Sequence, residues 1–211
     1  MVELYKAYAD YQDMMNIAES MFRTLAKDIL GTTEIDYQGT KIDLGSPWKR
    51  IPYVEAIKEY TGIDFGAITS VAEAIAAAKK AGVSCDEATS IWQVADEVLG
   101  EKVEHHFINP VFLTDYPKEL SPLAKSREDN PDIVERFELF IAGREMANAF
   151  TELNDPFDQK ERFEEQVKMR EAGDDEAQMM DHDYVAALEY GLPPTGGMGI
   201  GIDRLVMLFV N

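Results

Sequence analysis

The clearest hydrophobic pattern in the sequence is an apolar stripe between residues 10 and 31. Its members recur every three or four positions and are Met14, Ile17, Ala18, Met21, Phe22, Leu25, Ala26 and Ile29. This spacing places them on one face of a helix, and Gly31 is a typical helix end. The pattern predicts a long helix that turns this face to the core, where its methionines pack rather than form a cofactor site.

Residues 135–155 carry a different pattern, with the alternation of a β-hairpin. The segment ERFELFIAGREMANAFTELND predicts two strands joined by a turn at Ala142-Gly143. Asn148, Phe150 and Glu152 are two residues apart, so a strand turns all three side chains to one face. An amide, a ring and a carboxylate fill a core poorly, which makes this face a candidate binding surface.

Glu138 and Glu145 bring two more carboxylates to the same predicted hairpin. Carboxylates held close together need a cation to offset their repulsion and their loss of water. A metal ion or the ammonium group of a substrate would supply that charge. The alternative is that the acids form the wet side of an antiparallel sheet, and the pattern alone leaves both interpretations open.

Shorter elements are expected before this hairpin. Residues 1–11 alternate as a strand, residues 34–44 predict a hairpin turning at Gln38-Gly39, and residues 48–60 predict a connection and a helix with Pro52 in its first turn. Residues 61–107 are rich in alanine and suggest a small helical insertion with a Ser70-x-x-Glu73 start. A strand is expected over residues 108–113, then a turn at Tyr116-Pro117 into another short strand.

The last third of the chain combines charged helices with a glycine-rich stretch. A helix beginning at Asp155-Pro156 is expected to present a wet, charged surface, and another covers residues 181–189. The string PPTGGMGIGIDRLVMLFVN then predicts close backbone approach followed by a buried helix, with Arg204 able to reach over the glycines. Neither the Walker nor the dinucleotide-binding string is present, so a tight strand crossing with Arg204 in a surface pair is equally compatible.

Composition narrows the class of protein. The 211 residues are 45% hydrophobic and carry a net charge of -20, which fits a globular domain and argues against nonspecific nucleic-acid binding. Cys85 stands alone, and no apolar run is long enough for a bilayer, so a cytoplasmic protein with no membrane contact is expected. His105 and His106 are adjacent and point apart on a helix, which makes them poor metal ligands.

Three separated segments resemble the class II lysyl-tRNA synthetases. GMGIGIDRLVML is similar to the third signature motif of class II aminoacyl-tRNA synthetases, and ELYKAYADY with FELFIAGREMANAFTELNDPFDQKERFEEQ resembles the lysyl enzymes specifically. The resemblance covers nearly the whole chain. It implies an α+β fold, an antiparallel sheet flanked by helices, and formation of lysyl-adenylate from lysine and ATP with Mg²⁺, followed by transfer to tRNA(Lys).

The resemblance also implies roles for individual residues. Glu3, Tyr5 and Glu152 would hold the lysine ammonium, with Asn148 and Phe150 beside it. Glu138 and Glu145 would bind Mg²⁺ on the ATP phosphates, and Arg204 would pair with ATP over a floor lined by Gly199 and Gly201. Arg204 and Glu145 would be the catalytic residues.

Parts of the family pattern lie outside these 211 residues: the anticodon-binding OB domain, the first motif, which builds a homodimer, and the arginine of the second motif. The expectation is therefore an incomplete catalytic domain over residues 1–211, with weak or no lysine activation alone. Two other functions stay open. One is a lysine- or nucleotide-binding module, and the other is a truncated paralogue of the family that lysylates a translation factor.

Overall fold

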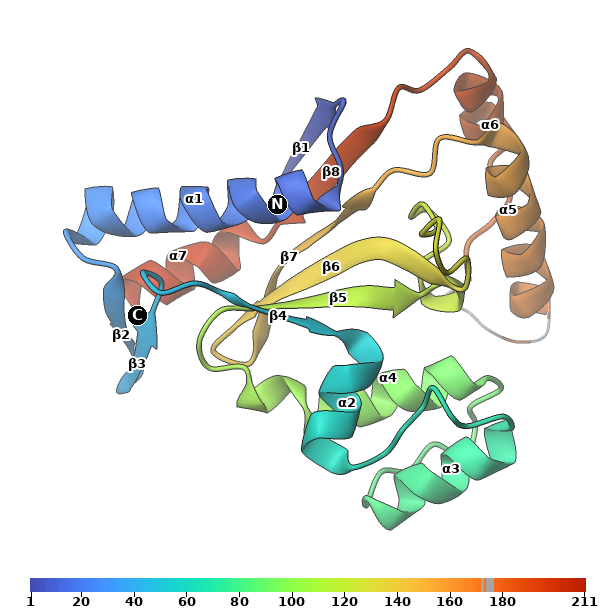
Figure 1. Ribbon diagram of the computed structural model, residues 1–211, viewed down its shortest axis with the longest axis horizontal. Coiled ribbons are helices and arrows are strands. Elements are labelled where there is room, and N and C mark those ends of the chain that lie inside the picture. The colour runs from blue at the N-terminus through green and yellow to red at the C-terminus, as the bar shows by residue number, and fades with distance from the viewer. Residues whose placement is uncertain (172, 174–176) are drawn as a thin grey trace.

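A six-stranded sheet forms the centre of the chain in the computed structural model, which describes residues 1–171, 173 and 177–211 (Figure 1). The sheet has the order β1-β8-β7-β6-β5-β4, from β1 (Val2–Ala7), β4 (Lys49–Pro52), β5 (Val111–Pro117), β6 (Ile133–Ile141), β7 (Arg144–Thr151) and β8 (Thr195–Ile200). A separate hairpin joins β2 (Glu34–Tyr37) and β3 (Thr40–Asp43). The helices are α1 (Tyr11–Leu30), α2 (Tyr53–Thr61), α3 (Val71–Lys80), α4 (Ile91–Lys102), α5 (Pro156–Glu171), α6 (His182–Glu189) and α7 (Ile202–Val210), with 3-10 turns η1 (Glu104–His106) and η2 (Lys118–Leu120).

The sheet is mixed rather than purely antiparallel. Strands β1, β8, β7, β6 and β5 pair antiparallel in that order, as expected, but β4 lies parallel to β5. The sequence prediction missed β4 and placed only a connection before α2. This strand has only four residues, too few to show the alternation that marks a strand. It also ends at Pro52, which has no amide hydrogen to donate and so argues against a strand in the sequence. The α+β class with helices flanking a sheet is confirmed.

Helix α1 covers one face of the sheet, as its apolar stripe predicts. Met14, Ala18, Phe22 and Ala26 are fully buried in one cluster with side chains of β6, β7 and β8. Asp10 caps the first turn by accepting from the amides of residues 12 and 13, and the helix ends before Gly31, whose φ of 73° is left-handed. Helix α1 contacts β8, β7 and β6, and Figure 1 shows it beside the β1 and β8 side of the sheet. It thereby seals this part of the face from water.

The opposite face is covered over only part of its width. Helices α2 and α4 pack on β4 and β5 in a second core cluster that includes Tyr53, Tyr116 and Phe140. Beyond β6 this cover ends, and β1 at the far edge is mostly exposed. The expected helical character of residues 61–107 appears as α3 and α4, and Ser70 caps α3 by accepting from the amide of Glu73. An open strip of sheet is left beside these helices.

The two predicted hairpin turns are confirmed. Ala142 and Gly143 join β6 to β7 with φ values of 54° and 67°, and Gln38 and Gly39 join β2 to β3 with φ values of 51° and 80°. Two consecutive positive φ angles are the mark of the turn that suits the twist of a two-residue hairpin. A bulge after Leu139 then shifts the β6–β7 pairing before the turn. The turn and bulge together set which residues of the hairpin face the open strip.

The prediction for the region after η1 is wrong in two respects. The strand begins at Val111 rather than at residue 108, and it runs through Tyr116-Pro117, where a turn was expected. A 3-10 turn, η2, then replaces the predicted second strand. The register slips between Thr114 and Tyr116 because Asp115 has a positive φ of 58°, and this bulge lets Tyr116 enter the core.

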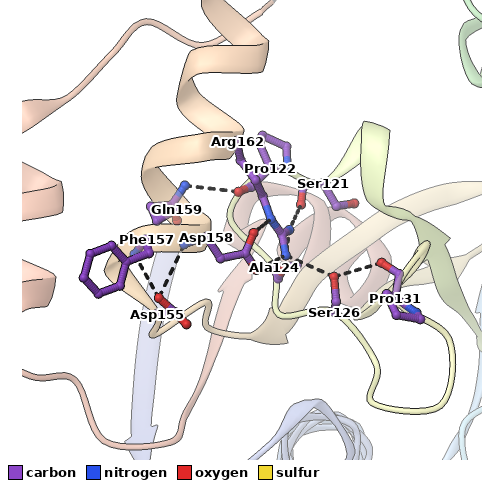
Figure 2. A network of polar contacts seen from close by, with 10 residues as sticks. All are labelled: Ser121, Pro122, Ala124, Ser126, Pro131, Asp155, Phe157, Asp158, Gln159 and Arg162. Carbon is purple, nitrogen blue, oxygen red and sulfur yellow. Dashed lines mark hydrogen bonds and ion pairs between the residues drawn. The ribbon is translucent and has the colours of Figure 1, made fainter.

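Most charged side chains of α5 are exposed, as expected, but some polar residues of the helix depart from this prediction. Arg162 is only 2% exposed, and Gln159 is fully buried. Figure 2 shows Arg162 reaching from α5 into the loop after η2, where it donates to the carbonyls of Ser121 and Ala124 and to the hydroxyl of Ser126. It also pairs with Asp158, one turn earlier on the same helix. The buried arginine therefore ties α5 to this loop.

Helix α7 is only half buried, in contrast to the expectation of a buried helix. Leu205 and Leu208 face the core, whereas Val206 and Val210 are exposed.

No helix within the described parts of the chain has both the length and the apolar character needed to cross a membrane.

Replacing Arg162 tests the tie between α5 and the loop. In Arg162→Leu the carbonyls of Ser121 and Ala124 lose their donor and Asp158 loses its partner, so we expect the free energy of unfolding to fall by about 3 kcal/mol in urea denaturation. Lys160→Leu removes an exposed cation from the same helix and should change it by less than about 0.5 kcal/mol. Equal, small effects in the two variants would contradict this role.

Candidate functional site

Strand pairing across the open strip places the predicted site residues in rows. Glu3 on β1 lies opposite Gly199 on β8, which lies opposite Asn148 on β7, and Asn148 lies opposite Glu138 on β6. Paired residues in a sheet project from the same face. Since Gly199 has no side chain, the row leaves a trough between the carboxylate of Glu3 and the amide of Asn148.

A second row lies two residues along the strands. Tyr5 pairs with Gly197, and Gly197 pairs with Phe150. Glu152 follows β7 and projects from the same face as Phe150; its amide donates to the carbonyl of Thr195. Aromatic rings thus form the two sides of the trough, and a carboxylate closes its end.

These rows line a hollow of about 660 Å³. Its walls and floor are formed by Met1, Glu3, Tyr5, Glu145, Met146, Ala147, Asn148, Phe150, Glu152, Gly197, Met198, Gly199, Gly201, Asp203, Arg204 and Met207. Every residue predicted for the lysine side of the site is present, and so are Gly199, Gly201, Glu145 and Arg204. In particular, Glu3 and Glu152, from distant parts of the chain, line one cavity.

Glu152 is the most unusual side chain in this hollow. It is 8% exposed, and burial raises the pKa of its carboxyl from 4.5 to about 7. Within the described residues no Lys, Arg or His forms an ion pair with it. The carboxylate of Glu152 lies over Gly197, where an added Cβ would overlap its Oε1 and press on the ring of Tyr5. A buried carboxylate without a cation is unfavourable, so this position is suited to a positively charged ligand.

Glu3 and Glu152 both affect the pKa of the Tyr5 phenol. Burial raises the pKa of its phenol first, and the negative charges of Glu152 and Glu3 raise it further. The phenol therefore stays protonated and can act as donor and acceptor between the two carboxylates. Two carboxylates and a hydroxyl converge at this end of the hollow, as a filter for an ammonium group requires.

A second, more polar hollow of about 380 Å³ adjoins the first. It is lined by Glu104, Glu138, Phe140, Arg144, Glu145 and Arg204, so Glu145 and Arg204 border both hollows. The expectation that Glu138 and Glu145 face a common space agrees with this arrangement. Burial raises the pKa of Glu138, while Arg136 and a hydrogen bond from Tyr116 oppose that shift.

Arg204 lies at the boundary between the two hollows. Its guanidinium donates to the carbonyl of Glu145 at 2.6 Å and to the carboxylate of Glu145 at 3.2 Å. The side chain also packs over Gly201, where a Cβ would lie 3.4 Å from its Cδ. Both members of this pair are well exposed, so the guanidinium can exchange its partner for an anionic ligand.

The chemistry of the acids fits a magnesium ion shared with phosphate. Mg²⁺ in proteins takes one or two carboxylates and completes its shell with phosphate oxygens and water. Glu138 and Glu145 supply two carboxylates on one hollow. Among all the described residues, this hollow included, no group of three or more His, Cys, Asp and Glu side chains could hold a metal ion without other ligands.

Sequence reasoning missed several residues that shape these hollows. Gly197 supports Glu152, yet only Gly199 and Gly201 were predicted; the two-residue spacing of the glycines could have identified it. Arg136 lies two residues before Glu138 and so on the same face, which was a usable signal. No such signal marked Tyr116, because this residue was assigned to a turn. His106, for its part, stacks on Tyr60 at 4.8 Å and does not line either hollow.

The whole chain is similar to known proteins. A family described as "tRNA synthetases class II (D, K and N)" matches residues 1–211. The chain is 57% identical over its full length to the lysine–tRNA ligase of Carboxydothermus hydrogenoformans and 53% identical to that of Bacillus subtilis. It covers 43% and 42% of these two proteins, so it spans about two fifths of the length of the relatives it matches.

The raised pKa of Glu152 predicts a pH-dependent stability. The folded chain holds the proton of Glu152 more tightly than the unfolded chain, so this group lowers stability as the pH rises from about 4.5 through about 7. Glu152→Gln is neutral throughout. Its free energy of unfolding relative to wild type should therefore rise by roughly 2 kcal/mol between pH 5 and pH 8 in urea titrations. Glu161→Gln, on the exposed side of α5, is the control, and a pH-independent difference for Glu152→Gln would refute the burial effect.

Proposed function

Because this chain belongs to the class II tRNA synthetases, we propose that it forms part of the catalytic domain of a lysine–tRNA ligase and takes part in making lysyl-adenylate from lysine and ATP. The observation that carries the proposal is the buried carboxylate of Glu152, held over Gly197 without a cationic partner among the described residues. The end of the larger hollow is accordingly assigned to the side-chain ammonium of lysine.

Recognition of lysine follows from the groups at that end. Glu3 and Glu152 supply negative charge, and Tyr5 supplies a hydroxyl between them. Hydrogen bonds to a charged partner contribute about 1.5–3 kcal/mol each, and an uncharged analogue would leave the buried carboxylate of Glu152 unpaired. Phe150 forms an apolar wall along the methylene chain. Selectivity then comes from the cost of binding anything without the ammonium.

The polar hollow is assigned to ATP. Glu138 and Glu145 would hold Mg²⁺, which when bound neutralises phosphate charge, and Arg204 would leave its pair with Glu145 to contact the nucleotide. The floor of Gly199 and Gly201 lets the reacting groups approach the backbone closely. Since the two hollows share Glu145 and Arg204, the carboxylate of lysine and the α-phosphate can meet at their border.

The proposed reaction needs no nucleophilic side chain. The lysine carboxylate attacks the α-phosphorus in line, a phosphorus–oxygen bond forms, and pyrophosphate leaves with the bonding electrons. The protein contributes by positioning the two substrates and by neutralising charge. In the complete protein the lysyl group would pass to tRNA(Lys) in a homodimer, and residues 61–107, with α3 and α4, would be a helical insertion in this domain.

ATP–pyrophosphate exchange by the complete protein that contains these 211 residues tests the proposal. Lysine should support exchange, while norleucine, which lacks the ammonium, should be about 10³-fold less effective or worse. Gly197→Ala should raise the KM for lysine by about 10–100-fold, since its Cβ displaces Glu152.

Gly199→Ala is the matched comparison, because a Cβ there meets nothing closer than Met1 Sδ at 3.6 Å and should affect lysine less. Equal exchange with lysine and norleucine would overturn the proposal. Lysine binding in calorimetry without any exchange would instead support a lysine-binding module.

A further inference from the structure

One arginine contacts a lining residue of each of the two hollows. Arg136, on β6, is 14% exposed at its side chain and donates from one terminal nitrogen to Glu138 Oε1 at 2.6 Å. Its Nε donates to Asn148 Oδ1 at 3.1 Å. Glu138 lines the polar hollow, and Asn148 lines the larger one. A single rigid guanidinium therefore contacts one residue of each hollow without lining either.

We propose that Arg136 is a positioning residue that couples the two hollows: it presents Glu138 to the divalent cation and orients Asn148 toward the bound amino acid. The inference rests on the proposed function of the two hollows. It adds a residue that touches neither substrate. Its effect is to make the metal subsite and the amino-acid subsite depend on the same geometry.

The contact with Asn148 fixes which way the amide faces. Arginine carries only donors, so the atom of Asn148 that faces Arg136 must be the amide oxygen. The NH2 group is then left for the hollow, where it offers a donor to an acceptor oxygen of the substrate. Without Arg136 the amide could turn over, and Asn148 would present an acceptor to the same oxygen.

The contact with Glu138 has a similar effect on the metal side. Oε1 accepts from Arg136, and Oε2 accepts from the hydroxyl of Tyr116 at 2.8 Å. Each carboxylate oxygen can accept a second partner, so these two bonds hold the group in one orientation and leave both oxygens able to face a cation. Groups that orient a metal ligand in this way typically change metal affinity or activity by about 10–100-fold when removed.

Arg136 is itself fixed from behind. Its other terminal nitrogen donates to the carbonyl of Leu120 at 2.9 Å and to Ser121 Oγ at 2.8 Å, and its guanidinium stacks on Tyr116, 4.4 Å from the ring centre. The carbonyl of Ser121 accepts in turn from Arg162 on α5 (Figure 2). Ser121 thus links Arg136 to the buried Arg162, so the loop after η2 holds Arg136 in place.

Two binding measurements on the complete protein test the coupling without requiring turnover. Calorimetry measures lysine binding in the absence of nucleotide and metal, and electron paramagnetic resonance measures Mn²⁺ binding with ATP in the absence of lysine. Arg136→Lys keeps the charge but not the fork of donors, and it should weaken both by about 10-fold or more. Arg136→Met should weaken both further, and Ser121→Ala should act in the same direction but less.

A double-mutant cycle separates positioning from a general loss of structure. In an Asn148→Ala background, Arg136→Lys should have no further effect on lysine binding, while its effect on Mn²⁺ persists. Arg127→Lys is the matched control, since Arg127 pairs with the carboxylates of Asp115 and Asp129, and neither of these nor Arg127 lines a hollow. It should change neither affinity.

The outcomes are distinct. Unchanged affinities in Arg136→Lys and Arg136→Met, or effects that add to those of Asn148→Ala, would overturn the coupling alone. A wild-type protein that binds neither lysine nor Mn²⁺ with ATP would overturn the proposed function, and the coupling with it.

Discussion

The cost of keeping a carboxylate out of water is the constraint on which this site depends. Glu152 is almost fully buried and has no cationic partner within the described structure. Its burial raises the pKa of its carboxyl to about 7. Such a group persists only where its surroundings hold it firmly. Here Gly197 supplies space beneath the carboxylate, and the backbone of Glu152 is fixed by Thr195 on one side and by a bridge to Ala124 on the other.

The rest of the fold serves to hold that arrangement in register. A slip of one residue between β7 and β8 would turn Asn148, Phe150 and Glu152 toward α1 and turn the side chain of Ala149 toward the hollow. Alanines are tolerated beneath α1, but an acid there would face a sealed apolar cluster. The tight turn at Ala142-Gly143 and the packing of α1 therefore exclude the alternative register. The positions of the site side chains are thus set by core residues that do not touch a ligand.

Local patterns in the sequence were sufficient for the elements with strong periodicity and clear end signals. The stripe from Met14 to Ile29 predicted α1, and the turn at Ala142-Gly143 predicted the central hairpin. The shared face of Asn148, Phe150 and Glu152 follows from strand geometry alone. Resemblance to a family suggested the roles proposed for Glu3, Tyr5 and Arg204, whose convergence with that face requires pairings between strands far apart in the chain.

What local patterns could not supply were features decided by tertiary contact. Strand β4 is short and exists by pairing parallel to β5, and Tyr116 enters the core only because Asp115 takes a left-handed conformation. Arg162 looks like one charge among many on α5, yet it is buried because the loop after η2 offers it carbonyl acceptors. A charged residue's burial depends on partners that the sequence does not bring near it, so its role becomes visible only in the fold.

The most direct measurement of the central claim is the pKa of the Glu152 carboxyl in the free and the lysine-bound protein, followed by carbon-13 NMR. The account predicts a value near 7 in the free protein and a fall of more than about 2 units on binding, since an ammonium at that position favours the charged carboxylate. A free value near 4.5, or a value that lysine leaves unchanged, would contradict it.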